Sequence, residues 1–191
     1  TAMFFNGAEG DQSPILNEAI DGYKKIEIYG KKIAVKAFDL FNEIKPRKVK
    51  DFKYSYNTIT LPEHTAHPSF MKTGGEEYGL NENTVKIVME MLGPTEVGLG
   101  AVRIGDLLLS GVPGEMTAEL GMGVKKSIKS SGVKYVAIGG LANEWISYIL
   151  SRDQYLNGEG YESSVSFYGP DLGSIISTGI IKTALPLTKS K

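Results

Sequence analysis

The chain has 191 residues, of which 41% are hydrophobic and 23% charged, a composition typical of a soluble globular domain. Its formal net charge of -1 gives no reason to expect a nucleic-acid partner. The absence of cysteine excludes disulfides, thiolate zinc ligands and a cysteine nucleophile, and no apolar run approaches the ~20 residues of a membrane-spanning helix. Because the chain begins at Thr1 and runs directly into apolar residues, we expect a processed or truncated product.

The first third of the chain predicts two strands with a long helix between them. Residues 2–5 are apolar and precede an Asn-Gly turn pair, which indicates a short buried strand. Residues 26–44 place apolar side chains at helical spacing, and Pro46 prevents the helix from continuing. Residues 52–61 alternate aromatic and polar side chains, the pattern of a half-buried strand.

A run of basic residues connects the predicted long helix to the strand after it. It consists of Lys45, Arg47, Lys48, Lys50 and Lys53. We interpret the run as a solvated connection, and a patch for an anionic surface is the alternative.

Glycine and proline separate the remaining elements. Residues 61–80 contain two prolines and a Gly-Gly pair, and an irregular loop of this length is often functional. The patterns that follow predict helices at residues 82–92, 117–130 and about 169–184, and strands at residues 96–103, 106–111 and 135–138. Helices and strands alternate without strict order, so we expect an α/β domain of mixed α+β layers, with a central mixed sheet flanked by helices.

Two oxygen donors follow core elements in the second half. Glu115 precedes a predicted helix, where it is either an acid stabilised by the helix dipole or a carboxylate metal ligand. Tyr148 follows the strand at residues 135–138; a tyrosine in an apolar run usually packs in the core, but a divalent cation makes its phenol oxygen a usable ligand. Tyr161 brings a second phenol to the same region, again with packing as the alternative.

Two further groups have functional and structural interpretations. Asp11 and Ser13 lie in a glycine-containing loop whose backbone amides could hold an oxyanion, although a turn in which both side chains bond their own backbone is simpler. His64 and His67 are the only histidines. Prolines flank them and argue against a helix that would present both rings to a metal, so we expect loop packing rather than zinc ligation.

Taken together, these segments resemble the neutral/alkaline (non-lysosomal) ceramidase family of zinc amidases. Residues 10–14 match its Gly-Asp-x-Ser-Pro motif, residues 113–117 its Pro-x-Glu-x-Thr segment, and residues 143–148 its Asn-x-Tyr-x-x-Tyr segment. A Tyr-Glu pair and a Tyr-Gly-Pro run follow in family order within residues 161–170. The resemblance is specific in the second half of the chain and looser over residues 15–95.

The resemblance implies a zinc-dependent amidohydrolase that cleaves the N-acyl bond of ceramide to a fatty acid and sphingosine. It implies Glu115 and Tyr148 as ligands of Zn2+ and Tyr161 as a catalytic residue that contacts the amide. Ser13 would be the second catalytic residue, positioning water and substrate in preference to acting as a nucleophile. The substrate-binding residues implied are Asp11, Asn143 and Trp145.

The chain also departs from the family pattern. Trp145 stands where the family has the first tyrosine of its segment, and residues 153–154 are Asp-Gln where it has two glutamates. The family's two histidine ligands lie upstream of the serine motif. We therefore expect residues 1–191 to be the C-terminal portion of a larger catalytic domain, without the histidine-bearing part and without the β-sandwich that many members carry. An upstream segment or second polypeptide would supply the histidines, and the chain alone should hold zinc weakly.

Three functions stay open. The first is a ceramidase-like amidase, and the second is a hydrolase of another N-acyl amide lipid, which the unusual residues 151–164 would suit. The third is a non-catalytic lipid-binding module of the same fold. The expected partners are a ceramide-like lipid and a peripheral membrane contact, without nucleic acid. The resemblance places the protein outside the cell, in the periplasm or at a membrane surface.

Overall fold

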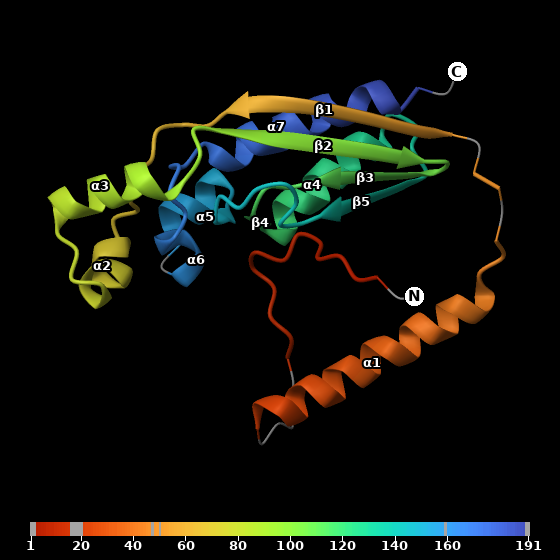
Figure 1. Cartoon of the computed structure of the whole chain (residues 1–191), viewed down its shortest axis with the longest axis horizontal. Coiled ribbons are helices and arrows are strands. Elements are labelled where there is room, and N and C mark those ends of the chain that lie inside the picture. Colours follow the sequence, from red (N-terminus) through yellow and green to blue (C-terminus); the bar gives the residue numbers. More distant parts are fainter. Residues whose placement is uncertain (1–2, 16–20, 47, 50, 159, 190–191) are drawn as a thin grey trace. The chain divides into compact units, whose positions relative to one another are not determined.

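The computed structural model describes residues 3–15, 21–46, 48–49, 51–158 and 160–189 (Figure 1). It divides into two compact units, one formed by Thr1–Gln12 with Asp51–Lys191 and the other by Ser13–Lys50. The described part of the smaller unit contains the helix α1 (Gly22–Glu43). This helix begins four residues earlier than the apolar spacing predicts, because the Asp21 side chain caps it by accepting a hydrogen bond from the Lys24 amide at 2.8 Å.

The larger unit is built on a four-stranded mixed sheet in the order β1-β2-β3-β5 (Figure 1). Strands β1 (Phe52–Thr60), β2 (Glu96–Ile104) and β3 (Leu107–Gly111) are antiparallel, whereas β5 (Tyr135–Gly139) runs parallel to β3. The turn between β2 and β3 places Gly105 at a φ of 59°, where a side chain would be strained. The predicted fold class is confirmed.

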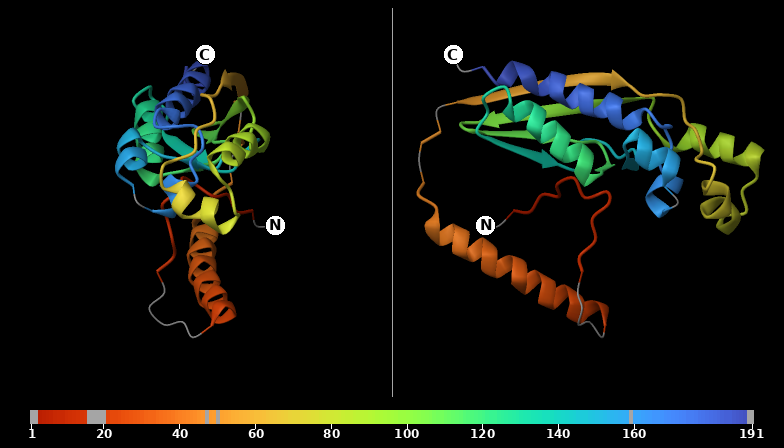
Figure 2. Two further views of the ribbon diagram at one scale, coloured as in Figure 1. Left: turned by 90° about the vertical axis from the view of Figure 1, so that its left-hand side faces the viewer. Right: turned by 180° about the vertical axis from the view of Figure 1, so that it is seen from behind.

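Helices α4 (Ala118–Lys129) and α7 (Leu172–Ala184) lie side by side on one face of this sheet (Figure 2). The crossover from β3 through α4 to β5 is the connection that two parallel neighbouring strands require. The main core lies between the helices and the sheet, and its most buried members include Leu99, Leu108, Val124, Ile128, Ile176 and Ile180.

The strand predicted at residues 2–5 is wrong. Residues 3–5 form no strand and are exposed, while residue 2 lies outside the described residues. An apolar run becomes a strand only where a neighbouring strand pairs with its backbone, and these residues have no such neighbour. Strand β1 forms where a strand was predicted, and its aromatic side chains Phe52, Tyr54 and Tyr56 lie on its more exposed face.

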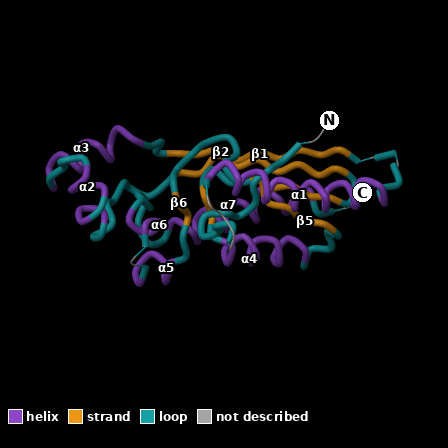
Figure 3. Tube along the Cα trace, turned by 90° about the horizontal axis from the view of Figure 1, so that it is seen from below, coloured by secondary structure: helices purple, strands orange, loops and turns teal. Residues whose placement is uncertain are grey.

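Smaller elements complete the unit at one end of the sheet. A second, two-stranded sheet pairs β4 (Glu115–Met116) with β6 (Tyr148–Ile149) in parallel. Seen from below, α2 (Gly74–Glu77) and α3 (Glu82–Leu92) project beyond the strands (Figure 3). The remaining short helices are η1 (Phe70–Lys72), α5 (Arg152–Asn157), α6 (Tyr161–Ser164) and η2 (Leu185–Leu187).

Candidate functional site

Strands β4 and β6 bring Glu115 and Tyr148 together, because the two residues are register partners in the small parallel sheet. The Glu115 amide donates to the Ser147 carbonyl at 3.0 Å, which fixes this register. The strands approach closely because residue 114 is glycine, and a Cβ there would lie 2.5 Å from the Ser147 oxygen. Two residues far apart in the sequence therefore present their side chains at one place.

The Glu115 carboxylate is the centre of a group of polar and aromatic side chains. Burial, a hydrogen bond to this carboxylate and its negative charge together raise the pKa of the Tyr148 phenol, with burial the largest cause. The indole Nε1 of Trp145 donates to Glu115 Oε1 at 3.4 Å. The Tyr161 ring meets the Tyr148 ring edge-on, with 5.9 Å between centroids. Four of the predicted site residues thus lie together.

These four side chains line one wall of a cavity of about 580 Å3. Its other walls are mainly apolar and come from α3, from residues 165–167 and from residues 70–80, where the predicted loop instead contains the short helices η1 and α2. The apolar lining residues include Phe70, Leu80, Val88, Met89, Val165 and Phe167. The cavity therefore joins a polar end at Glu115 to a hydrocarbon-like interior.

The N-terminal loop docks directly behind Glu115. The Gly10 amide donates to the Met116 carbonyl at 2.9 Å, and a Cβ on Gly10 would overlap the Glu115 backbone. Asp11 Oδ1 accepts a hydrogen bond from the Ala118 amide at 2.8 Å and so caps α4, because the side chain of the N-cap residue Thr117 does not cap the helix itself. Asp11 is therefore placed as a helix cap, and its role in substrate binding stays a prediction.

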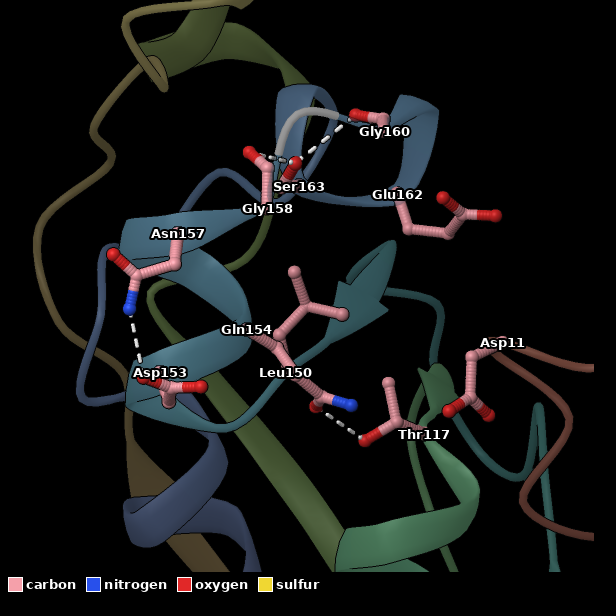
Figure 4. A pocket seen from close by; sticks show the side chains of 10 residues that line it. All are labelled: Asp11, Thr117, Leu150, Asp153, Gln154, Asn157, Gly158, Gly160, Glu162 and Ser163. Atoms are coloured by element: carbon pink, nitrogen blue, oxygen red, sulfur yellow. Dashed lines mark hydrogen bonds between the residues drawn. The ribbon is translucent and has the colours of Figure 1, made fainter.

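A second, smaller pocket of about 260 Å3 lies beside Asp11 and does not include Glu115 (Figure 4). Three of its lining residues are acidic, namely Asp11, Asp153 and Glu162. On the inner side, Thr117 Oγ1 donates to Gln154 Oε1 at 2.9 Å and ties α5 to the start of α4. The pocket therefore lies where the N-terminal loop, the start of α4 and α5 are joined by hydrogen bonds.

Glu9 is a residue that the sequence analysis missed. Both oxygens of its carboxylate are buried and have no hydrogen-bond partner among the described residues. Burial raises the pKa of Glu9, an effect that the residue's own backbone amide opposes and that repulsion from Glu115 slightly increases. The carboxylate lies against Gly140, where a Cβ would come within 2.5 Å of Oε2. No pattern in the sequence signals this burial, because it depends on how the loop docks.

The other predicted residues lie elsewhere. Ser13 is exposed and opens the unit of Ser13–Lys50, so its catalytic role stays a prediction. Asn143 adopts a φ of 74°, and its side-chain amide donates to the Gly98 carbonyl at 3.4 Å. Leu141 and Ser147 also have positive φ, at 54° and 66°. The loop that delivers Trp145 and Tyr148 is therefore strained, and its shape is held by contacts with the main sheet.

Both histidines are engaged in packing, as the flanking prolines led us to expect. His67 is buried, and its Nε2 donates to the Tyr155 carbonyl at 2.8 Å while its Nδ1 lies 2.6 Å from the Ser69 hydroxyl. His64 Nε2 lies 3.1 Å from the Tyr168 hydroxyl, which itself donates to the Pro94 carbonyl. Because that hydroxyl has one proton, His64 must be the donor in the first bond.

Glu115 and Tyr148 suit a zinc ion as two oxygen ligands, since their side chains already share a hydrogen bond. Protein zinc sites use three or four protein ligands. Among the residues that the structure describes, no three His, Cys, Asp or Glu side chains are grouped to hold a metal. The described donor set therefore fits part of a zinc site.

No family model matches the chain. The neutral ceramidase of Pseudomonas aeruginosa is 33% identical over 81 residues, a match that covers 40% of this chain and 12% of that protein. Neutral ceramidase 1 of Arabidopsis thaliana is 35% identical over 107 residues, covering 51% of this chain and 13% of that protein. The crystal structure of the Pseudomonas aeruginosa neutral ceramidase has a TM-score of 0.55 at 20% identity, covering 72% of this chain and 28% of that one.

The matches are partial, since the chain spans about an eighth of the length of these curated relatives. Similarity to a bacterial and a plant protein supports common descent of the matched segments, and the structural likeness shows a shared fold. The chain is therefore related to the neutral ceramidase family, over part of its own length and a smaller part of theirs.

Proposed function

We propose that this chain forms part of the active site of a zinc-dependent amidohydrolase that cleaves the N-acyl bond of ceramide. One observation carries the proposal: Glu115 and Tyr148 are paired at the polar end of an apolar cavity. The names of the similar proteins supply the substrate class, a ceramide. The products would be a fatty acid and sphingosine.

Glu115 and Tyr148 would hold the zinc together with histidines from an upstream segment or a second polypeptide. Zinc, when bound, supplies a Lewis acid that activates water and polarises the amide carbonyl. Trp145 keeps the Glu115 carboxylate oriented through its Nε1–H bond. The Tyr148 phenol is protonated near neutral pH, and its raised pKa means that only a strong local positive charge, such as that of a bound cation, would favour the deprotonated oxygen.

The remaining roles follow from the cavity. Tyr161 stands beside Tyr148 with its hydroxyl able to donate to the amide oxygen, where negative charge develops during attack. Ser13 would position water and substrate, and Asp11 and Asn143 would hold the loops that frame the substrate. The apolar walls would bind a hydrocarbon chain, because they remove its surface from water.

The test compares paired variants that all line the same cavity. Glu115→Gln and Tyr148→Phe change the paired ligands, whereas Glu77→Gln and Tyr78→Phe make the same chemical changes farther along the wall. Intact-mass analysis of the natural material first establishes whether a histidine-bearing polypeptide accompanies the chain. Hydrolysis of a soluble short-chain ceramide and zinc content by mass spectrometry are then measured on that assembly.

We expect ceramide hydrolysis and zinc content to fall at least tenfold in Glu115→Gln and Tyr148→Phe. Both should stay near the wild-type values in Glu77→Gln and Tyr78→Phe. Cleavage of N-acyl ethanolamines in preference to ceramide would assign the cavity to another lipid amide. Binding of ceramide without zinc or hydrolysis would make the chain a lipid-binding module.

A further inference from the structure

Helix α1 has one apolar face and one lysine-rich face, and neither is buried. The apolar side chains recur at helical spacing along its whole length, at Ile26, Tyr29, Ile33, Ala37, Leu40 and Phe41. Ile33 is 42% exposed and Phe41 69% exposed, and no α1 residue is buried. A soluble helix normally covers such a stripe, so an exposed one marks a surface that binds something.

The charge of this region differs from that of the rest of the chain. Residues 22–50 contain nine of the 21 Lys and Arg residues but three of the 22 Asp and Glu residues, a formal charge of +6 in a chain of net charge -1. Five of the lysines lie on α1 itself. Glu27 is neutralised by ion pairs with Lys24 at 3.0 Å and Lys31 at 2.7 Å. The partner of α1 must therefore be both apolar and negatively charged.

We propose that α1 lies in the surface of an anionic lipid bilayer, with its apolar face among the acyl chains and its lysines at the headgroups. Lysines such as Lys32 and Lys36 flank the stripe, so their stems can lie along the hydrocarbon while the ammonium groups reach the phosphates. No helix among the described residues is long and apolar enough to cross a membrane. A nucleic acid would use the lysines but leave the Ile and Phe side chains in water.

The basic run after α1 would take part in the same contact with the bilayer. Lys45 and Lys48 are exposed directly beyond the helix, so they extend its cationic side and do more than connect two elements. Attachment to the bilayer would bring the protein to the membrane in which a ceramide resides. The inference concerns binding and stands apart from catalysis.

The experiment measures partition of the full chain onto large unilamellar vesicles by co-flotation. One set of vesicles contains phosphatidylcholine, and the other contains one part phosphatidylglycerol to two parts phosphatidylcholine. The double variant Ile33→Ser/Phe41→Ser truncates the apolar face. Val35→Ser is the matched control, because Val35 is 61% exposed and lies two residues from Ile33 on the polar side of the helix. The double variant Lys32→Gln/Lys36→Gln removes two charges, and circular dichroism checks helix content in each variant.

The wild type should bind the anionic vesicles at least about 25-fold more tightly than the neutral ones, with the difference lost at high salt. The partition coefficient on anionic vesicles should fall at least about tenfold in the apolar double variant. In the lysine variant it should fall about fivefold for each charge removed. Val35→Ser should bind like the wild type.

Absence of binding to anionic vesicles at low salt would overturn the proposal, as would equal losses for Val35→Ser and the apolar double variant. It would also be overturned by a wild-type oligomer that the apolar double variant converts to monomers, since α1 would then contact protein. A chain that binds vesicles but hydrolyses no soluble ceramide contradicts the proposed function and leaves this inference intact.

Discussion

Replacing Gly10 by alanine should detach or distort the loop that lies behind Glu115. A Cβ at this position would lie 2.8 Å from the Glu115 carbonyl carbon and 3.0 Å from the Met116 carbonyl carbon, and closer still to the Glu115 oxygen. All three are backbone atoms, so no side-chain rotation can relieve the overlap. Either β4 moves or the loop leaves its place, and with it go the Gly10–Met116 and Asp11–Ala118 hydrogen bonds.

We expect Gly10→Ala to lower the free energy of unfolding by about 1–3 kcal/mol, the usual cost of overpacking. Gly7→Ala is the matched control, since nothing lies within 4 Å of its added Cβ. Neither glycine has a positive φ, so alanine is free of backbone strain at both positions. The control should be unchanged or gain about 0.4–1 kcal/mol, because alanine reduces the entropy of the unfolded chain.

The free energies are measured by urea unfolding followed by circular dichroism, and hydrogen exchange of the Ala118 amide reports whether the loop stays docked. In Gly10→Ala this amide should lose protection because its acceptor, Asp11, has moved away. Equal stabilities of the two variants, together with an unchanged Ala118 exchange rate, would refute the docked position of the loop.

Three further predictions concern single side chains. Asp11→Ala should cost about 1 kcal/mol in urea unfolding by removing the α4 cap, whereas Asp11→Asn keeps an acceptor and should lose much less; equal losses would contradict the cap. Burial raises the pKa of Glu9, so its contribution to stability falls as pH rises above the unfolded value near 4.5. Glu9→Gln should therefore gain about 1 kcal/mol in urea unfolding at neutral pH and nothing below pH ~4, and a loss at neutral pH would show that the carboxylate has a partner. Burial also raises the pKa of Tyr168 to about 12. The folded state then holds the phenol proton more tightly, and stability should fall between pH ~10 and ~12 less steeply in Tyr168→Phe than in the wild type.

Much of the larger unit follows from sequence patterns. Helix α3 has the predicted bounds, because Asn81 and Thr84 form a capping box at its start and Gly93 follows its end. Strands β2 and β3 lie where the Gly105 turn separates two apolar runs. The pairing of Glu115 with Tyr148 was suggested by motifs alone, yet the two-residue strands that produce it are too short to give a periodic signal.

The sequence by itself determined the four longer helices, the strands of the main sheet and the kinds of side chain available for chemistry, because spacing, capping and turn residues act locally. Tertiary structure decided which of these residues meet. It placed Glu115, Trp145, Tyr148 and Tyr161 at one cavity, made Asp11 a helix cap and buried the Glu9 carboxylate. It also turned the aromatic face of β1 outward, since alternation fixes which side chains share a face of a strand but not which face is covered. Contacts between segments far apart in the chain decide which residues meet and which face of a strand is covered. A local sequence pattern carries no information about those contacts.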